Sequence, residues 1–343
     1  MAEPRFWQTK SHPTSLCLLP VSWLYGGLEA LRRKFTHAQH PGKPVICVGN
    51  LTAGGAGKTP SVQWLLKALR QDGQNPAILS RGYGGSEKGP LKVDAAAHSA
   101  IQVGDEPLML AQDAAVYIGA DRMASLRMAV RDGHDVLIKD DGFQNPSMAH
   151  HFNLIVLDAA SGIGNGRLLP AGPLRQNLSV GLEKLDALLL IGAPNQAALH
   201  PSVPRLLEML KAMGKPIFQA EIGATKTGSG AVHGFCGIAK PEKFRVSLAA
   251  QGYEVKQFSS FADHHHFTEA DAAKLLKSEL PLITTEKDMA RLQGAPAGTA
   301  RAQLAARAET LPIALKITDA DALSALIKSA LAQKQANQLY KSY

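Results

Sequence analysis

The stretch VICVGNLTAGGAGKTP, residues 45–60, decides the fold of this chain. It is a short apolar run that ends in a glycine-rich turn closed by Gly57, Lys58 and Thr59. Glycines let backbone N–H groups curl around phosphate oxygens, the lysine supplies a mobile positive charge, and the threonine hydroxyl can hold a magnesium ion. The pattern predicts a phosphate-binding loop made by Thr52, Ala53, Gly54, Gly55, Ala56, Gly57, Lys58, Thr59 and Pro60.

A helix is expected directly after this loop. Apolar residues recur there at helical spacing, Pro60 stands where a first-turn proline is tolerated, and Gly73 stands where a helix would stop. Strand, glycine loop and helix thus follow in the order that a P-loop needs. Thr52 departs from the strict pattern G-x-x-x-x-G-K-[ST], which has glycine at that position. A purely structural turn is the alternative interpretation of the glycine cluster.

Apolar runs alternate with helical patterns along the chain, and this predicts an α/β fold with a P-loop NTPase-like parallel sheet covered by helices. A length of 343 residues is comfortable for two domains. The small polar stretch ATKTGSG, Ala224–Gly230, predicts a linker before a second, smaller α/β domain. The expected strands are Ala77–Leu79, Val136–Ile138, Leu154–Leu157, Ala187–Ile191 and Ile217–Phe218.

These signals divide the chain into four parts. We expect an N-terminal apolar helix over residues 1–35, the P-loop domain over 36–223, the linker over 224–231 and the smaller domain over 232–343. Within the last part, Gln293–Ala308 is rich in Ala, Gly, Arg and Gln, which predicts an exposed insertion or a surface helix.

Composition narrows the class of partner. Lys and Arg outnumber Asp and Glu by 37 to 29, and the formal net charge of +8 suits anionic partners such as nucleotides, phosphorylated substrates or acidic lipid surfaces. The three cysteines show neither a metal-ligand spacing nor a disulfide framework, which fits a reducing cytoplasm. A nucleic-acid partner is disfavoured, because basic and aromatic residues are not interleaved in a base-stacking pattern.

The N-terminal segment is unusually apolar. Residues 16–31 are crowded with leucine and aromatic side chains, and Arg32, Arg33 and Lys34 follow. Pro20, Gly26 and Glu29 interrupt the run, so it is not a convincing membrane span, for which about 20 apolar residues are needed. The pattern favours an amphipathic helix that docks on an anionic membrane surface through residues 13–34. A helix packed on the protein's own core is the alternative.

Acidic residues stand at two places where phosphoryl chemistry could use them. Asp140 and Asp141 follow the expected strand at Val136–Ile138, where a P-loop enzyme holds magnesium, although a capped turn is the alternative. Asp105 and Glu106, in the stretch GDEP, are most simply the start of a helix, where acids complement the helix dipole. Their functional interpretation is a general base with a metal-directed neighbour.

Cations and rings recur at expected turns. Arg122, in ADR, is either a surface charge or a cation that binds the transferring phosphate. Tyr83 lies in RGYGG and Arg175 ends the rigid stretch LPAGPLR, and both stretches could bind a ligand or be ordinary turns. The stretch FADHHHF, 261–267, places three histidines beside an aspartate. Consecutive residues rarely converge on one metal ion, so acid, base or orienting chemistry is favoured over zinc.

Taken together, these segments resemble the tetraacyldisaccharide 4′-kinase family of lipid A biosynthesis. The resemblance covers the apolar N-terminal helix and a series of motifs in the same order, and the loop of that family accounts for Thr52. The motifs are GNLTAGGAGKTP, SRGYGG, GDEP, GADR, DDGFQ, GNGRLLPAGPLR, DHHHF and TTEKD, which ends at Asp288.

The resemblance implies transfer of the ATP γ-phosphoryl group to the 4′-hydroxyl of an acylated disaccharide 1-phosphate, which gives lipid IVA. It places the reaction at the cytoplasmic face of the Gram-negative inner membrane. It implies two α/β domains with the active site in the cleft between them, ATP and Mg²⁺ as cofactors, and no obligate protein partner.

The resemblance also implies roles for particular residues. Lys58 and the loop amides hold the β- and γ-phosphates, Asp105 accepts the proton of the sugar hydroxyl, and His264 raises the basicity of Asp105 from the second domain. Arg122 stabilises the transferring phosphoryl group. Magnesium ligands are expected at Thr59, Asp140, Asp141 and Glu106, and substrate contacts at Tyr83, Arg175 and Asn165.

Two positions depart from the family pattern. Asn145 stands where histidine is common and Gln176 where glutamate is usual, so neither is assigned a catalytic role. A P-loop GTPase or metallochaperone is the main alternative. Guanine recognition needs an Asn/Thr-Lys-x-Asp pattern, whereas Asp288 here follows Lys287 directly.

Overall fold

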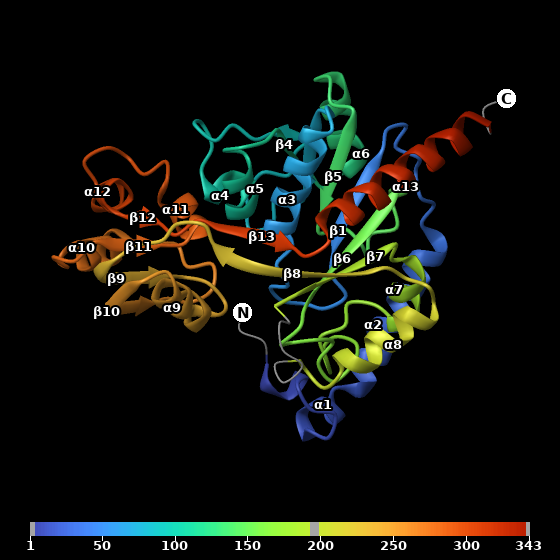
Figure 1. Cartoon of the computed structure of the whole chain (residues 1–343), viewed down its shortest axis with the longest axis horizontal. Coiled ribbons are helices and arrows are strands. Elements are labelled where there is room, and N and C mark those ends of the chain that lie inside the picture. The colour runs from blue at the N-terminus through green and yellow to red at the C-terminus, as the bar shows by residue number, and fades with distance from the viewer. Residues whose placement is uncertain (1–3, 193–198, 341–343) are drawn as a thin grey trace. The chain divides into compact units, whose positions relative to one another are not determined.

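In the computed structural model, residues 4–192 and 199–340 are described, without the side chains of 334–340 (Figure 1). By its internal contacts the chain divides into two compact units. The smaller unit holds Ser80–Asp121 and Gly223–Ala314, and the larger unit holds residues 4–79, Arg122–Ile222 and residues 315–340. This division differs from the sequence-based boundaries, which leave residues 80–121 in the P-loop domain and residues 315–343 in the other.

The larger unit carries most of the elements that surround the P-loop. Its helices and 3₁₀ turn are η1 Arg5–Trp7, α1 Pro13–Cys17, α2 Leu19–Phe35, α3 Lys58–Gln71, α6 Arg122–Arg131, α7 Leu178–Lys184, α8 Val203–Ala212 and α13 Ala320–Tyr340. Its strands are β1 Val45–Gly49, β2 Pro76–Ser80, β5 Val136–Asp140, β6 Phe152–Asp158 and β7 Ala187–Ile191, with parts of β8 Ile217–Ala224 and β13 Ile313–Ile317.

The sheet of the larger unit runs in the order β13-β8-β7-β6-β1-β5-β2. Strands β2, β5, β1, β6, β7 and β8 pair in parallel, so the expected α/β class with a parallel sheet and its five expected strands are confirmed. The chain leaves β1 toward β2 on one side, while β6, β7 and β8 extend the sheet on the other. Strand order therefore reverses beside the end of β1, which is where ligands bind in open α/β sheets.

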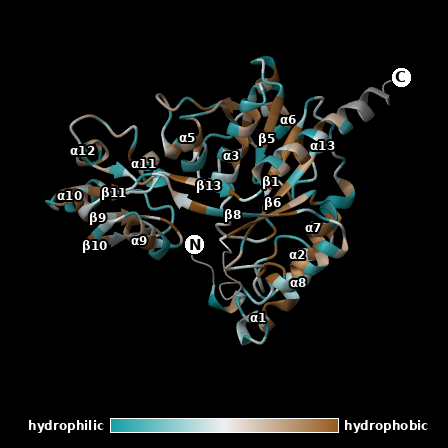
Figure 2. Cartoon of the chain, viewed as in Figure 1, coloured by the Kyte–Doolittle hydropathy of each residue, from teal (hydrophilic) through white to brown (hydrophobic). Residues whose placement is uncertain are grey.

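Helices cover both faces of this sheet. On one face α3 packs against β1 and β5, and α13 packs against β6. On the other face, α7 and α8 contribute Leu182 and Leu206 to a buried cluster with Ile155 and Leu188 of the sheet. Figure 2 shows β1, β5 and β6 as hydrophobic ribbons, as expected for strands that are buried on both faces.

The smaller unit is a second α/β assembly. Its separate sheet runs β10-β9-β11-β12 with every pair parallel, and β3 and β4 form an antiparallel pair. Helices α4 and α5 both pack against α11. Its elements are β3 Leu91–Lys92, α4 Ala100–Val103, α5 Asp105–Leu110, β4 Val116–Ile118, β9 Gly230–Cys236, α9 Pro241–Ala250, β10 Tyr253–Ser260, α10 Glu269–Leu276, β11 Leu282–Thr284, α11 Glu286–Leu292, α12 Ala300–Arg307 and β12 Glu309–Thr310.

Helix α12 lies in the stretch 293–308, which the sequence predicts as an exposed insertion or a surface helix. A helix does form, and Thr299 caps its first turn by accepting a hydrogen bond from the Ala302 amide. It is more than a surface feature, however, because Leu304 is fully buried in a cluster with Phe235 and Phe267. A single leucine among alanines was too weak a pattern to show this.

The N-terminal segment forms two helices, α1 and α2, that meet at Leu18. Small polar side chains attach them to the stretch 165–175: Ser15 Oγ donates to the Ala171 carbonyl at 2.6 Å, and Ser22 Oγ donates to the Leu168 carbonyl at 2.9 Å. A Cβ at Gly26 would lie 2.6 Å from Leu168 Cδ1, so glycine permits this close approach. Among the described residues, no helix is both long enough and apolar enough to cross a bilayer.

Asn165 is the centre of this attachment. Its side chain donates to Ser15 Oγ at 3.0 Å and to the Ala171 carbonyl at 2.9 Å, and it accepts from the Arg167 amide at 3.0 Å. The residue is 3% exposed. Its polar atoms therefore hold the protein's own chain together at this position.

Replacement of Asn165 tests this attachment. Asn165→Ala leaves buried partners without hydrogen bonds, and we expect the free energy of unfolding to fall by about 2 kcal/mol. Gln74→Ala, at an exposed position after α3, is the control and should change it by less than about 0.5 kcal/mol. Chemical denaturation measures both values. Equal stability of the two variants would contradict the proposed attachment.

Candidate functional site

The phosphate-binding loop joins β1 to α3 in the larger unit. Gly54 and Gly57 have φ of 117° and 87°, which side chains rarely allow, and a Cβ at Gly57 would lie 2.6 Å from Ile191 Cδ1. Helix α3 then begins at Lys58, so its first N–H groups and the positive end of its dipole stand at the loop. This arrangement is the one that binds phosphate in P-loops.

The stretch 165–175 supports the loop from outside. The Ala53 amide donates to the Pro173 carbonyl at 2.8 Å, and the Arg175 amide donates to the Leu51 carbonyl at 3.0 Å. Thr52 forms an isolated bridge with Leu174. The backbone on both sides of the glycines is thereby fixed by a second segment.

Asp141 lies next to this loop because of the sheet register. Val48 of β1 pairs with Asp140 of β5, and the Asp141 amide donates to the Val48 carbonyl at 3.0 Å. The Asp141 carboxylate contacts Lys58 Nζ at 3.4 Å and Arg175 Nη1 at 2.8 Å. Three of the predicted site residues thus meet within one unit, and Asp141 has a φ of 48°, a strained conformation typical of functional sites.

The two cations determine the charge of Asp141. Burial raises its pKa, but the charges of Lys58 and Arg175 and their hydrogen bonds lower it by more, so the pKa lies below its ordinary value. The carboxylate is therefore ionised at neutral pH, as a metal ligand must be.

The buried side chain of Lys139 leaves little room for a side chain at Gly142, the residue after Asp141. Lys139 is the last residue but one of β5, is fully buried, and places Nζ 3.0 Å from His150 Nε2. Burial and the charge of Lys139 lower the pKa of His150 to about 3, so the imidazole is neutral and can accept from the ammonium. A Cβ at Gly142 would lie 2.1 Å from Lys139 Cε, so only glycine fits the turn that presents Asp141.

Oxygen ligands suited to Mg²⁺ gather at this loop. Thr59 and Asp140 are 6% and 3% exposed, and their hydroxyl and carboxylate oxygens are the hard donors that Mg²⁺ prefers. No cluster of three or more His, Cys, Asp or Glu side chains that could hold a metal occurs among the described residues.

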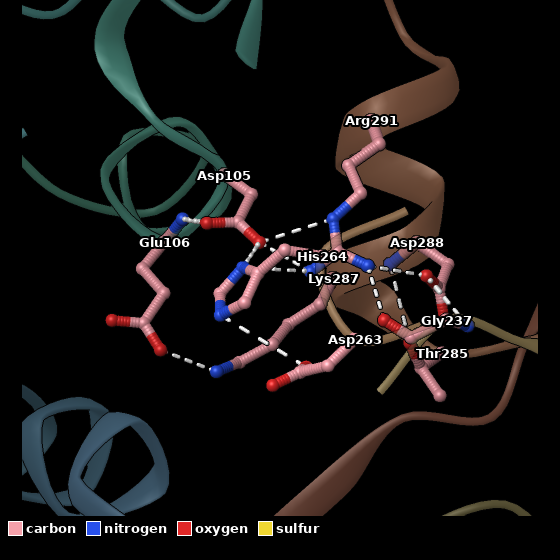
Figure 3. Close-up of polar contacts among 9 residues, drawn as sticks. All are labelled: Asp105, Glu106, Gly237, Asp263, His264, Thr285, Lys287, Asp288 and Arg291. Carbon is pink, nitrogen blue, oxygen red and sulfur yellow. Dashed lines mark hydrogen bonds and ion pairs between the residues drawn. The ribbon is translucent and has the colours of Figure 1, made fainter. Parts of the chain in front are cut away.

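Asp105 is the first residue of α5 in the smaller unit. Gly104, with a φ of 90°, precedes it, and a Cβ there would lie 2.5 Å from the Tyr83 carbonyl. The Asp105 carboxylate accepts hydrogen bonds from His264 Nδ1 at 3.0 Å and from Arg291 Nε at 3.0 Å, as Figure 3 shows. Its side chain is 9% exposed. The predicted pairing of Asp105 with His264 is present, and both residues belong to the same unit.

His264 is held in an unusual conformation. Its φ is 58°, and its amide donates to the Gly237 carbonyl at 3.1 Å. Its ring lies 6.5 Å from that of Tyr83 in an edge-on arrangement, and Tyr83 itself is 76% exposed. A protonatable ring and an exposed aromatic ring therefore stand beside Asp105.

The pKa directions at this pair contradict the expectation that His264 raises the basicity of Asp105. Burial raises the pKa of Asp105, but the hydrogen bond from His264 and the charge and hydrogen bonds of Arg291 lower it by more, so it lies well below its usual range. The hydrogen bond to Asp105 raises the pKa of His264, although burial opposes this. The pair therefore favours an anionic Asp105 beside a cationic His264.

Glu106, the predicted further metal ligand, is engaged in an ion pair. Its carboxylate contacts the Lys287 ammonium of α11 (Figure 3). Lys287 lies in the TTEKD stretch, to which sequence reasoning assigned no role. Lys287 therefore neutralises the carboxylate that the sequence predicts as a metal ligand.

Two further predicted site residues, Arg122 and Asn165, are buried. Arg122 is the first residue of α6 and is 5% exposed, and Asn165 lies where α1 and α2 attach to the stretch 165–175. Sequence reasoning missed Lys139, Lys287 and Arg291. The charged residues of TTEKD and the arginine three positions after it were the available signal for the last two.

The ionisation of His264 gives a direct test of the pair. Because its folded-state pKa is raised, His264 stabilises the fold below its ordinary pKa of about 6.5, and this contribution is lost as pH rises through the raised value. Asp105→Asn should lower the pKa of His264, measured by NMR titration of the imidazole. Asp263→Asn is the control, because its carboxylate lies 3.9 Å from Nε2, and should lower it less. An unchanged titration in Asp105→Asn would contradict the pairing.

Comparisons with known proteins agree with these features. The family model of LpxK, tetraacyldisaccharide-1-P 4'-kinase, matches residues 14–332. The tetraacyldisaccharide 4'-kinase of Parvibaculum lavamentivorans is 44% identical over 344 residues, with 97% of this chain and 99% of the relative covered. That of Bradyrhizobium diazoefficiens is 45% identical over 301 residues, with 86% and 88% covered.

A solved structure shares the fold. The crystal structure of LpxK from Aquifex aeolicus in complex with ATP aligns with a TM-score of 0.72 at 28% identity, covering 93% of this chain and 99% of that one. Both the family model and the relatives extend over most of the chain. This chain therefore belongs to the tetraacyldisaccharide-1-P 4'-kinase family.

Proposed function

We propose that this protein transfers the γ-phosphoryl group of ATP to the 4′-hydroxyl of a tetraacyldisaccharide 1-phosphate, the reaction that yields lipid IVA. The observation that carries the proposal is the Asp105–His264 pair, with Nδ1 3.0 Å from Oδ2. A hydrolytic P-loop switch needs to orient water, whereas an alcohol acceptor needs a positioned proton acceptor in addition to the nucleotide loop. The family to which the chain belongs indicates that this alcohol is the 4′-hydroxyl of the disaccharide.

The larger unit supplies the nucleotide-holding groups. Lys58 and the N–H groups at the start of α3 would bind the β- and γ-phosphates, with Thr59, Asp140 and Asp141 holding Mg²⁺ there. Bound Mg²⁺ neutralises phosphate charge. Arg175 is ion-paired with Asp141 at 2.8 Å and 27% exposed, so its remaining donors can reach a phosphate oxygen. Arg122 is the proposed second cation that stabilises the transferring phosphoryl group.

The smaller unit supplies the acceptor chemistry. The 4′-hydroxyl oxygen forms the new bond to γ-phosphorus, the bond between γ-phosphorus and the bridging oxygen of ADP breaks, and the hydroxyl proton passes to Asp105. His264 orients the Asp105 carboxylate and offsets its charge. Tyr83 is proposed to contact the sugar. Asn165, which the sequence predicted as a substrate contact, is proposed to act only through the attachment of α1 and α2.

Substitution of Asp105 tests the acceptor role. With labelled ATP, Mg²⁺ and the disaccharide monophosphate, the wild-type protein should yield a bisphosphorylated lipid, and Asp105→Ala should lower kcat by about 10²–10⁴. Glu87→Ala removes an exposed carboxylate of the same unit and should leave kcat unchanged. Ordinary kcat in Asp105→Ala would remove Asp105 from the mechanism. Nucleotide hydrolysis with no transfer to lipid would instead favour the GTPase or metallochaperone class.

The face of α2 that points away from the protein is apolar, and this supports membrane docking. Trp23, Leu24 and Leu28 are 70%, 64% and 58% exposed, whereas Ser22 on the opposite face is 2% exposed. A helix packed only on its own core has the reverse pattern. The helix ends with Arg32, Arg33 and Lys34, which suit anionic headgroups.

We therefore place the protein on an anionic membrane surface, at the cytoplasmic face of the inner membrane, where an acylated substrate is accessible. A helix that lies in the interface, with its apolar face among the acyl chains, agrees with the length and hydropathy of α2. The hydrogen bonds of Ser15 and Ser22 leave the apolar face unobstructed.

A triple substitution tests the docking surface. Trp23→Ser, Leu24→Ser and Leu28→Ser together remove burial worth about 1.5–3 kcal/mol for each side chain, so partitioning onto anionic vesicles should fall at least about tenfold. Val246→Ser, which is 63% exposed in the smaller unit, serves as the control and should partition like the wild type. Co-sedimentation with vesicles measures the effect. Unchanged sedimentation of the triple variant would refute the docking surface.

A further inference from the structure

Arg291 is a buried cation that contacts Asp105. Its side chain is 1% exposed and extends from α11 between two carboxylates (Figure 3). Nε donates to Asp105 Oδ2 at 3.0 Å, and Nη1 donates to Asp288 Oδ1 at 2.6 Å and to the Gly237 carbonyl at 2.7 Å. Nη2 also contacts Asp105 Oδ2. Every nitrogen of the guanidinium group therefore has an acceptor.

These bonds determine which oxygen of Asp105 faces the acceptor. Oδ2 accepts from His264 Nδ1 and from two nitrogens of Arg291, whereas Oδ1 accepts from the Glu106 amide at 3.0 Å. Oδ2 is thus surrounded by donors. Within the described part of the chain Oδ1 has one donor, the Glu106 amide, so Oδ1 is the oxygen that would accept the proton of an incoming hydroxyl.

The other end of Arg291 fixes the backbone that carries His264. The Gly237 carbonyl accepts from Arg291 Nη1 and also from the His264 amide, at 3.1 Å. The Gly237 amide donates to both oxygens of Asp288, at 3.1 Å each. One guanidinium group therefore sets the orientation of the carboxylate and the position of the main chain from which the histidine projects.

We propose that Arg291 is a positioning residue of the phosphoryl-transfer site, which acts by fixing Asp105 and His264 in the geometry that receives the acceptor hydroxyl. The inference rests on the proposed function. A planar fork with five donors can satisfy two carboxylates and a carbonyl at once, which an ammonium group cannot. Stability alone does not account for a buried ion pair of this kind, because a fold with apolar residues of similar volume in its place is often equally stable.

Arg291→Met and Arg291→Lys test the inference in the full-length protein with ATP, Mg²⁺ and the disaccharide monophosphate. Small misplacement of catalytic groups can cost about 10²-fold in rate, so both variants should lose about 10²-fold in kcat. The KM for ATP should stay within about threefold, because uniform binding of the nucleotide is not affected. Assays are made well below the melting temperature of each variant, and Arg291→Lys keeps the charge if Arg291→Met folds poorly.

A double-mutant cycle separates positioning from stability. If Arg291 acts through Asp105, then Arg291→Met in an Asp105→Asn background should lower kcat by less than about threefold further. Arg301→Met is the matched control: Arg301 donates to the Arg291 carbonyl at 3.0 Å from α12, and its loss should leave kcat within about twofold.

Three outcomes would overturn the inference. They are kcat of Arg291→Lys within about threefold of wild type, an undiminished effect of Arg291→Met in the Asp105→Asn background, and a loss of kcat in Arg301→Met as large as in Arg291→Met. An inactive wild-type protein would contradict the proposed function itself, so the two failures are distinguishable.

Discussion

The parallel pairing of β1 with β5 on one side and β6 on the other is the constraint on which the larger unit depends. This register sets Val48 opposite Asp140, so the loop after β1 and the turn after β5 leave the sheet at the same edge. A slip of one residue would exchange the faces of Lys139 and Asp140. One strand register thus brings the proposed phosphate-binding and metal-binding residues to the same edge of the sheet.

Asp105 and Asp141 are two aspartates whose pKa values are set by neighbouring cations. The Asp105 side chain is 9% exposed and that of Asp141 is 33% exposed. Cations lower the pKa of both carboxyl groups, Arg291 with His264 for Asp105, and Lys58 with Arg175 for Asp141. A proton acceptor with a lowered pKa is a weak base. That weakness is tolerable for phosphoryl transfer, whose loose transition state depends more on alignment and charge neutralisation than on proton abstraction. In the proposed reaction, the placement of Asp105 would therefore count for more than its basicity.

Sequence reasoning reached the features that are local in the chain. The strand, the glycine loop and helix α3 follow from patterns within about thirty residues, and the parallel sheet follows from repeated apolar runs. The division into two units did not follow from the sequence. Residues 80–121 belong to the same unit as residues 223–314, and no linker was predicted at residue 80 or at residue 121. Arg291 was also missed, since it lies 186 residues from Asp105 and no pattern in TTEKD connects them. Together with His264, that same arginine lowers the pKa of Asp105.

Helix α2 exposes its apolar side chains to solvent and packs its polar face against the protein. Leu24, Leu28 and Leu31 are more than half exposed to water, while the polar face of the helix is tied inward. Apolar faces of this kind associate with one another when no lipid covers them. In solution without lipid, the protein would shield these side chains by clustering with further copies or by taking up detergent. The solubility of the purified chain is thus a property of its surroundings as much as of its fold.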